Sequence, residues 1–263
     1  KKTGSAPFSL EGGGATRGLR DVSAGKSQLG GSCRLPLLNT TDNTAIAEEG
    51  NIKLLPLGWD SLVVITHPSN DAVSNISLEQ LRGVLTGKIT RWSELGGPDR
   101  PINLYIRKGK SSGVGRTLRQ QLFDNVDEEF SASAQVKGSS GAIEAAVEED
   151  PEAFAVSGIS SSRHRSVNML ALDGVKPTIK TLQKGKYPLF RILFLVAPPN
   201  YEDNRVLDKF VDFAYSLEGQ DIIMEAGTLP FHRGIFLMSQ VSFDYVQSIE
   251  AVEKQGIYTT GGH

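Results

Sequence analysis

Three short segments rich in glycine and hydroxyl side chains stand where helices are predicted to begin. They are 12–16, 111–117 and 138–141. The start of a helix has unpaired N–H groups and the positive end of the helix dipole, so it can hold an oxyanion. Any one segment alone is better explained as a cap or a tight turn. Together with Arg34 and Arg107 beside similar loops, the three segments predict an oxyanion site if the fold brings them together.

Two glycine motifs for nucleotide phosphates fit poorly. Residues 12–18 have the spacing GxGxxxG, whereas dinucleotide sites use GxGxxG. Residues 109–111 and 25–27 match the end of a P-loop, but the first glycine of that motif is replaced by Leu104 and Arg20. Neither kind of nucleotide site is therefore predicted.

Residues 109–113 also read G-x-S-x-G, with Ser111 between a predicted strand and a predicted helix, as in an α/β-hydrolase. Asp203 or Asp208, followed by His232, would complete the chain order Ser, Asp, His. Two charged residues separate the strand from the motif, and no HGGG-like oxyanion segment precedes it. A serine hydrolase is therefore the third hypothesis for function.

Composition restricts the class of ligand. The chain of 263 residues has 28 basic and 30 acidic side chains, a net charge of −2, so it lacks a global positive field for nucleic acid. The 4 histidines lack metal-ligand spacing, and the single cysteine, Cys33, cannot form an internal disulfide, which leaves the redox compartment open. No apolar run approaches the roughly 18 residues of a membrane helix. We expect a soluble protein with a local anion site, no metal and no cofactor.

Strands and helices alternate along the chain, which predicts an α/β fold with parallel βαβ units. The length allows two lobes or one large unit. Ser77 is a candidate N-cap and Gly87 a helix end. The predicted strands include 8–11, 52–57, 60–66 and 191–197, and the predicted helices include 15–24 and 206–217.

Several segments resemble signatures of the phosphate-binding substrate-binding proteins of ABC transporters. Residues 78–97, which read LEQLRGVLTGKITRWSELGG, are similar to a helix followed by the turn "tGkItnWselGG" in that family. Residues 185–191, 216–220 and 25–34 resemble its segments "GkYPl.R", "S.eGQ" and "G..DIg.sSR". The similarity covers nearly the whole chain in the family's order.

The resemblance implies a type II periplasmic-binding-protein fold, in which two lobes, each a mixed sheet flanked by helices, are joined by two crossing strands. The crossings would be 61–66 and 191–196. Lobe one would contain 1–64 and 190–263, and lobe two 65–189. The family's first strand and its Gly-Ser-Ser-Thr loop would precede Lys1.

The resemblance also implies the ligand residues. Gln28 stands where the family has an aspartate that separates protonated from fully ionised oxyanions, so Gln28→Asp is expected to raise selectivity for phosphate over sulfate more than about tenfold. Val114 replaces the threonine of the family's Ser-Gly-Thr loop. The predicted ligand residues are Gln28, Ser32, Arg34, Arg107, Ser111, Ser112 and Gly113, with Ser139 and Ser140 as additional hydroxyls.

The leading hypothesis is reversible binding of phosphate or a related tetrahedral oxyanion between the lobes, without catalysis, for uptake through an ABC transporter permease. We expect a monomer in the periplasm or outside the cell, with lipid anchoring left open and a signal sequence outside this chain. The second hypothesis is a sensory or interaction domain with the same fold and altered or lost ligand binding.

Overall fold

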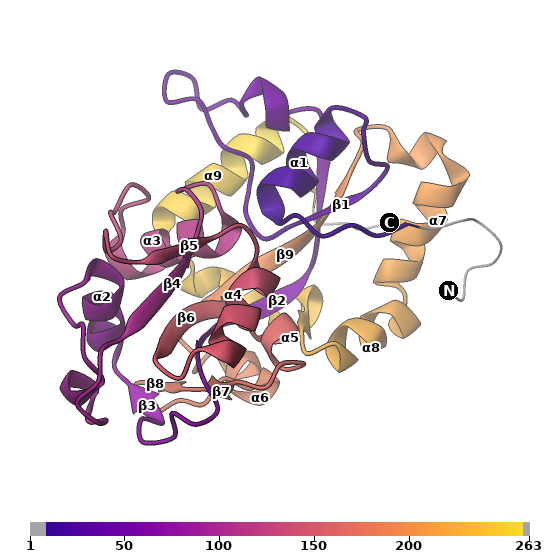
Figure 1. Ribbon diagram of the computed structural model, residues 1–263. Helices are drawn as coiled ribbons and strands as arrows, with labels where there is room; N and C mark the ends of the chain where they lie inside the picture. Colours follow the sequence, from indigo (N-terminus) through magenta and orange to yellow (C-terminus); the bar gives the residue numbers. More distant parts are fainter. Residues whose placement is uncertain (1–8, 260–263) are drawn as a thin grey trace.

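One long strand, β2 (Lys53–Thr66), runs through the middle of the computed structural model, which describes residues 9–259 (Figure 1). Its first part, as far as Ser61, pairs antiparallel with β9 (Phe190–Ala197). Its last part, from Leu62, pairs antiparallel with β6 (Ala153–Gly158). A single continuous strand therefore belongs to both lobes.

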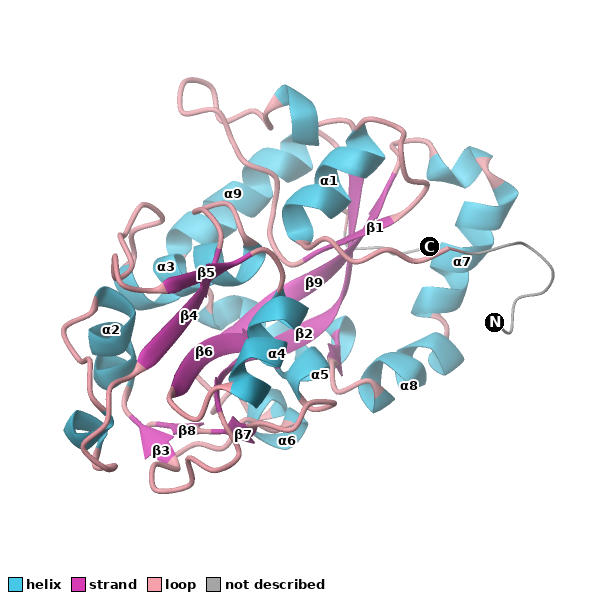
Figure 2. Ribbon diagram, in the orientation of Figure 1, coloured by secondary structure: helices cyan, strands magenta, loops and turns pink. Residues whose placement is uncertain are grey.

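The remaining strands complete a mixed α/β architecture (Figure 2). They are β1 (Gly30–Ser32), β3 (Asn75–Ile76), β4 (Asn103–Arg107), β5 (Gln135–Lys137), β7 (Asn168–Met169), β8 (Ala171–Leu172) and β10 (Leu229–Pro230). The main sheet has the order β1-β9-β2-β6-β4-β5, and β7 and β10 also pair with β2. Strand β4 is parallel to β5 and β6, whereas the partners of β2 are antiparallel to it. The mixed sheets predicted from the resemblance are present.

Helices cover both ends of β2. The α-helices are α1 (Ala15–Ser23), α2 (Leu78–Thr86), α3 (Gly113–Phe123), α4 (Ser140–Glu149), α5 (Ile159–Ser162), α6 (Ile179–Gln183), α7 (Arg205–Tyr215), α8 (Leu217–Glu225) and α9 (Phe243–Lys254). Short 3-10 segments are η1 (Ala47–Glu49), η2 (Trp92–Leu95), η3 (Tyr201–Asp203) and η4 (Phe231–Gln240). Figure 1 shows α1 and α9 around one end of β2, and α2 and α4 around the other.

Each lobe has its own apolar core. Trp92 is fully buried in one core and Trp59 in the other, as expected for packing residues. Along the chain, core membership changes between Trp59 and Leu62 on β2, and again between Leu189 and Phe190, apart from Leu182 of α6. The lobe limits 1–64 with 190–263, and 65–189, remain a prediction.

The structure corrects three expected strands. The two predicted strands, 52–57 and 60–66, are a single strand in the structure, β2, which begins at Lys53 and has a register shift between Pro56 and Gly58. The expected crossing residues 191–196 lie within β9, which pairs with β1 and the first part of β2. Of the expected strand 8–11, Phe8 lies outside the described residues and 9–11 are not in a strand.

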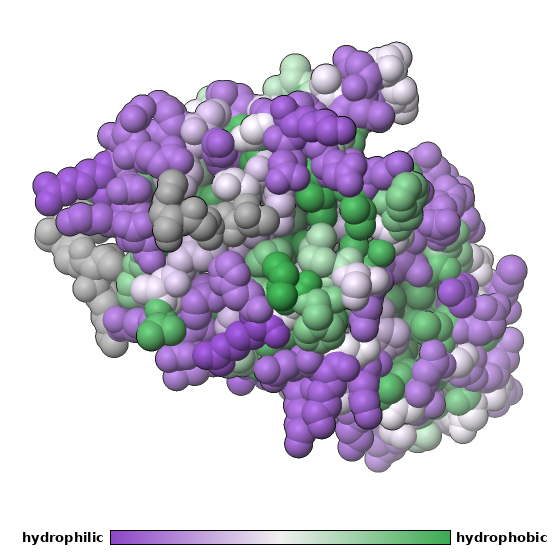
Figure 3. Space-filling view, turned by 180° about the vertical axis from the view of Figure 1, so that it is seen from behind, coloured by the Kyte–Doolittle hydropathy of each residue, from purple (hydrophilic) through white to green (hydrophobic). Residues whose placement is uncertain are grey.

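Apolar surface is concentrated away from the start of α1. Figure 3 shows apolar residues gathered in the middle of the face opposite to that of Figure 1, with polar residues around them. Large exposed apolar side chains come mainly from α7, α8, η4 and the first residue of α9: Val206, Phe210, Leu217, Ile222, Ile235, Phe236 and Phe243.

Candidate functional site

The starts of α1, α3 and α4 meet at one open cleft of ≈ 590 Å³. Its lining comes from the first turn of α1, the loop between β4 and α3, and Gly138 before α4: Gly13, Ala15, Thr16, Arg17, Arg20, Asp21, Lys26, Arg107, Lys108, Gly109, Ser111, Ser112 and Gly138. Residues of all three segments singled out in the sequence therefore line the same cleft.

The first helix presents bare N–H groups to this cleft. Its N-cap is Gly14, which has φ 79° and no side chain to accept a capping hydrogen bond. A Cβ atom at Gly14 would lie 3.0 Å from Nη2 of Arg107, so the guanidinium packs closely against the start of the helix. Glycine is needed here both for the left-handed backbone and for this close approach. The helix start and the arginine can thus act on the same anion.

Arg107 is a cation without a paired carboxylate in the described part of the chain. Its Nη1 donates to Oγ of Ser140 over 3.1 Å, while its buried Nε has no partner among residues 9–259. Burial lowers the pKa of Arg107, and the nearby Arg191 lowers it further although Cys33 opposes this. An arginine stays protonated despite such a shift. A bound anion would relieve both the unpaired charge and the unpaired donor.

The predicted hydroxyl groups differ in what they can still donate, and of Ser32, Ser112 and Ser139 only Ser112 is in the cleft lining. Ser112 and Ser139 accept capping hydrogen bonds from the N–H groups of Gly115 and Ala142, which leaves each hydroxyl proton available. Ser32, by contrast, is buried and donates its proton to the carbonyl of Arg34 over 2.7 Å. Of the predicted hydroxyls, Ser32 alone is thus committed as a donor elsewhere.

Four other predicted residues have distinct places. Ser111 lines the cleft, and Gly113 is buried at the first position of α3. Arg34 is only 3% exposed and lies behind the cleft lining, where Glu49 pairs with it. Gln28 is exposed in the loop before β1 and is outside the cleft lining.

The cleft is more basic than its motifs suggested. Among the described residues, four further cations line it, Arg17, Arg20, Lys26 and Lys108, and the one carboxylate of this part of the lining, Asp21, pairs with Arg17 over 3.0 Å. A chain with a net charge of −2 therefore carries a local cationic cleft. Arg17 and Arg20 are three residues apart, which puts them on one face of a helix, and this spacing is the feature of the sequence that could have predicted the basic cleft.

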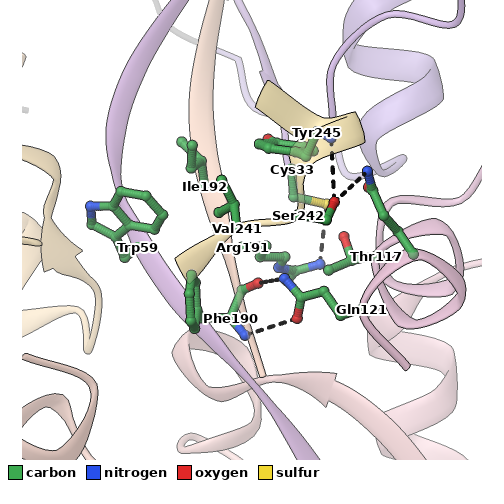
Figure 4. Close-up of a pocket in the computed structure, with 11 residues that line it drawn as sticks. Cys33, Trp59, Thr117, Gln121, Phe190, Arg191, Ile192, Val241, Ser242 and Tyr245 are labelled. Carbon is green, nitrogen blue, oxygen red and sulfur yellow. Dashed lines mark hydrogen bonds between the residues drawn. The ribbon is translucent and has the colours of Figure 1, made fainter. Parts of the chain in front are cut away.

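A second, much smaller pocket beside α3 has a volume of ≈ 20 Å³ (Figure 4). Cys33, Thr117, Gln121, Arg191 and Ser242 are among its lining residues, and Nη1 of Arg191 lies 3.1 Å from Sγ of Cys33. The charge of Arg191 is balanced by Asp60 at 2.8 Å. Because this volume holds about one water molecule, the open cleft is the candidate site.

The parts of a serine hydrolase are not assembled. Within residues 9–259, no histidine lines the cleft and Ser111 has no hydrogen bond to one. The ring of His232 instead packs near Phe231 and Tyr215, with centroid distances of 5.9 and 6.2 Å. The described residues also contain no cluster of acidic, histidine and cysteine side chains suited to a metal ion, and none of their helices is long and apolar enough to cross a membrane.

Comparison with known proteins gives consistent matches. The model of the PBP superfamily domain matches residues 1–218. The chain is 30% identical over 200 residues to the phosphate-binding protein PstS of Borreliella burgdorferi, covering 73% of this chain and 71% of that one. It is 29% identical over 229 residues to the phosphate-binding protein PstS of Bacillus subtilis, covering 86% of this chain and 71% of the relative.

Solved structures agree with these matches. A Clostridium perfringens protein, assigned as a phosphate ABC transporter substrate-binding protein and holding bound phosphate, superposes with a TM-score of 0.71 at 27% identity, over 82% of this chain and 84% of that chain. PstS from Borrelia burgdorferi gives a TM-score of 0.51 at 28% identity, over 81% and 83% of the two chains. The type II fold expected from the sequence is confirmed.

Proposed function

We propose, from the premise that this chain belongs to the PstS-type phosphate-binding proteins of the PBP superfamily, that it binds phosphate or a closely related tetrahedral oxyanion in the open cleft. Proteins of this family bind their ligand without converting it, so the chain is not an enzyme. We further propose that it delivers the anion to an ABC transporter permease and works in the periplasm or outside the cell.

The convergence of three helix starts on Arg107, which has no carboxylate partner in the described chain, carries this proposal. The N–H groups of α1 have no side-chain cap, and the hydroxyls of Ser111 and Ser112 lie at the same opening. Arg107, these N–H groups and these hydroxyls all donate hydrogen bonds, and none of them carries a negative charge. Such a set suits an acceptor-rich anion, since charge-assisted hydrogen bonds are the strong ones.

Replacing Arg107 by alanine tests the proposal. A hydrogen bond to a charged group contributes about 1.5–3 kcal/mol, so Arg107→Ala is expected to weaken phosphate binding about tenfold to a hundredfold. A Ser111→Ala, Ser112→Ala double variant is expected to weaken it in the same direction. Isothermal titration calorimetry with phosphate, sulfate, molybdate and a phosphonate measures both the affinity and the preferred anion.

Arg91→Ala is the matched control because it removes the same charge from an exposed ion pair with Asp99, outside the cleft lining. Its phosphate affinity is expected to equal that of the parent protein, since exposed pairs contribute about 0–1 kcal/mol. An Arg107→Ala protein that binds as tightly as the Arg91→Ala protein would show that the loop is only a helix cap.

A further inference from the structure

We infer that Arg34 is a positioning residue: its charge is committed to Glu49, and its guanidinium holds the loop before α3 against the start of α1. The inference rests on the proposed function, because it assigns a role at the same cleft. Arg34 was expected to bind the anion directly. The hydrogen bonds around it lead to a different role.

All five N–H donors of a guanidinium have partners at Arg34. Two reach the carboxylate of Glu49, with Nη1 at 2.7 Å from Oε2 and Nη2 at 2.9 Å from Oε1. Nη1 also donates to the carbonyl of Leu35 at 2.8 Å, Nη2 to Oγ1 of Thr16 at 3.1 Å, and Nε to the carbonyl of Ser111 at 2.8 Å. Nothing on the guanidinium remains for an anion.

These contacts tie together parts of the cleft that are distant in sequence. Thr16 belongs to the first turn of α1, whereas Ser111 precedes α3 across the cleft. Oγ1 of Thr16 donates to the same Ser111 carbonyl over 3.2 Å. The start of α3 also packs closely against Cys33, since a Cβ atom at Gly113 would lie 2.0 Å from Sγ of Cys33. Arg34 therefore fixes the separation of two helix starts that line the cleft.

Glu49 holds Arg34 in this orientation. Its side chain is fully buried, and its oxygens also accept from Nε of Arg20 at 3.1 Å and from the N–H of Leu37 at 3.0 Å. Burial alone would raise the pKa of Glu49, but the hydrogen bonds and charge of Arg34 outweigh burial and leave that pKa below its usual value. The carboxylate is thus ionised and saturated at neutral pH.

Neutralising Glu49 separates a positioning role from a ligand role by the sign of its effect. If the charge of Arg34 acted on the anion, Glu49→Gln would add one net positive charge near the cleft and tighten binding. If Arg34 positions the loop, the same change loosens the guanidinium and weakens binding. Arg34 and Thr16 belong to the predicted lobe one and Ser111 to lobe two, so the two lobes separate more readily when this contact is loosened. The loss of affinity is therefore expected in the dissociation rate more than in the association rate.

The experiment compares phosphate binding by the parent chain, Glu49→Gln and the matched control Glu48→Gln, which alters an exposed neighbour. Stopped-flow and calorimetric titrations are expected to give at least an about tenfold weaker affinity for Glu49→Gln, since buried donors lose a charged partner, and no change for Glu48→Gln. Equal or tighter binding by Glu49→Gln would overturn the inference.

Arg34→Lys carries the test if Glu49→Gln does not fold. Lysine keeps the charge but cannot hold Glu49, Thr16 and Ser111 together, so the same loss is expected; retained affinity would count against positioning. Small-angle scattering without ligand adds an independent readout, with a larger radius of gyration expected for both variants. If the parent chain binds no oxyanion, the proposed function fails, and an unchanged radius would overturn the positioning role separately.

Discussion

Carboxylates are scarce at the candidate site, and this bears on which anion it prefers. Asp21 is the one acidic residue in the cleft lining, and Arg17 holds it over 3.0 Å. A carboxylate accepts a hydrogen bond from the proton of HPO₄²⁻ but repels sulfate. With its one carboxylate already paired, the lining offers little basis for separating the two anions.

Gln28→Asp tests where this discrimination arises. The family resemblance led us to expect that this change raises phosphate-over-sulfate selectivity, but Gln28 is exposed and outside the cleft lining. We now expect the ratio of the two affinities to change less than about twofold, because solvent and salt screen an exposed charge. Competition titrations at one pH and salt concentration measure it; a tenfold rise would place Gln28 against the ligand.

Sequence alone located some cleft residues but did not reveal the hydrogen-bond partners of others. Arg107, Ser111 and Ser112 could be predicted because Arg107 ends a strand and the two serines follow it in the loop that leads to a helix start. Arg34 was correctly placed near the site, but its partner Glu49 is 15 residues away without a helical or strand spacing to reveal the pair. Which acidic residue an arginine meets depends on tertiary packing, so its commitment to Glu49 was invisible.

At the scale of elements, helix ends were the most predictable feature. The Ser77 hydroxyl accepts from the N–H of Gln80, and the side-chain oxygen of Gln80 accepts from the N–H of Ser77, which forms the capping box of α2. Gly87 closes the same helix with φ 77°, a conformation that favours glycine. Both ends were expected from local residue types, because capping chemistry acts over only a few residues.

Ser77→Ala should therefore destabilise the protein by about 0.5–2 kcal/mol, without changing anion affinity. Urea unfolding followed by circular dichroism measures the free energy of unfolding. Ser248→Ala is the control, because that hydroxyl bonds only the carbonyl of Asp244 one turn earlier in α9. A Ser77→Ala protein as stable as this control would mean that the capping box contributes little to α2.

Strand continuity was the least predictable feature of the elements. Two strands were expected here, one ending at Leu57 and the next beginning at Asp60, because Gly58 is a usual turn residue. In the structure the strand continues through this segment, with a shift in its register relative to β9 between Pro56 and Gly58. A Cβ atom at Gly58 would lie 2.7 Å from the carbonyl of Leu229, so this glycine admits β10 beside β2. Leu229 is 171 positions after Gly58, so the sequence around Gly58 does not predict this contact.

At the scale of the whole molecule, the alternation of strands and helices predicted the α/β class but left one unit or two lobes open. The resemblance supplied the two-lobed fold. It could not supply the neighbours of β9, which pairs with β1 through Val196 and Gly30. Such pairings join residues far apart in sequence, and the separation of the helix starts across the cleft depends on them.

The strand shared by both cores has a thermodynamic consequence. Leu54 of β2 is buried in one core and Leu62 in the other. If either core melts, β2 loses hydrogen-bonding partners and apolar packing, and the other core depends on the same strand. The lobes are therefore expected to melt together. Scanning calorimetry should give one peak whose van't Hoff enthalpy equals the calorimetric enthalpy; two resolved peaks would mean that β2 can come apart at Asp60 and Ser61 without disturbing either core.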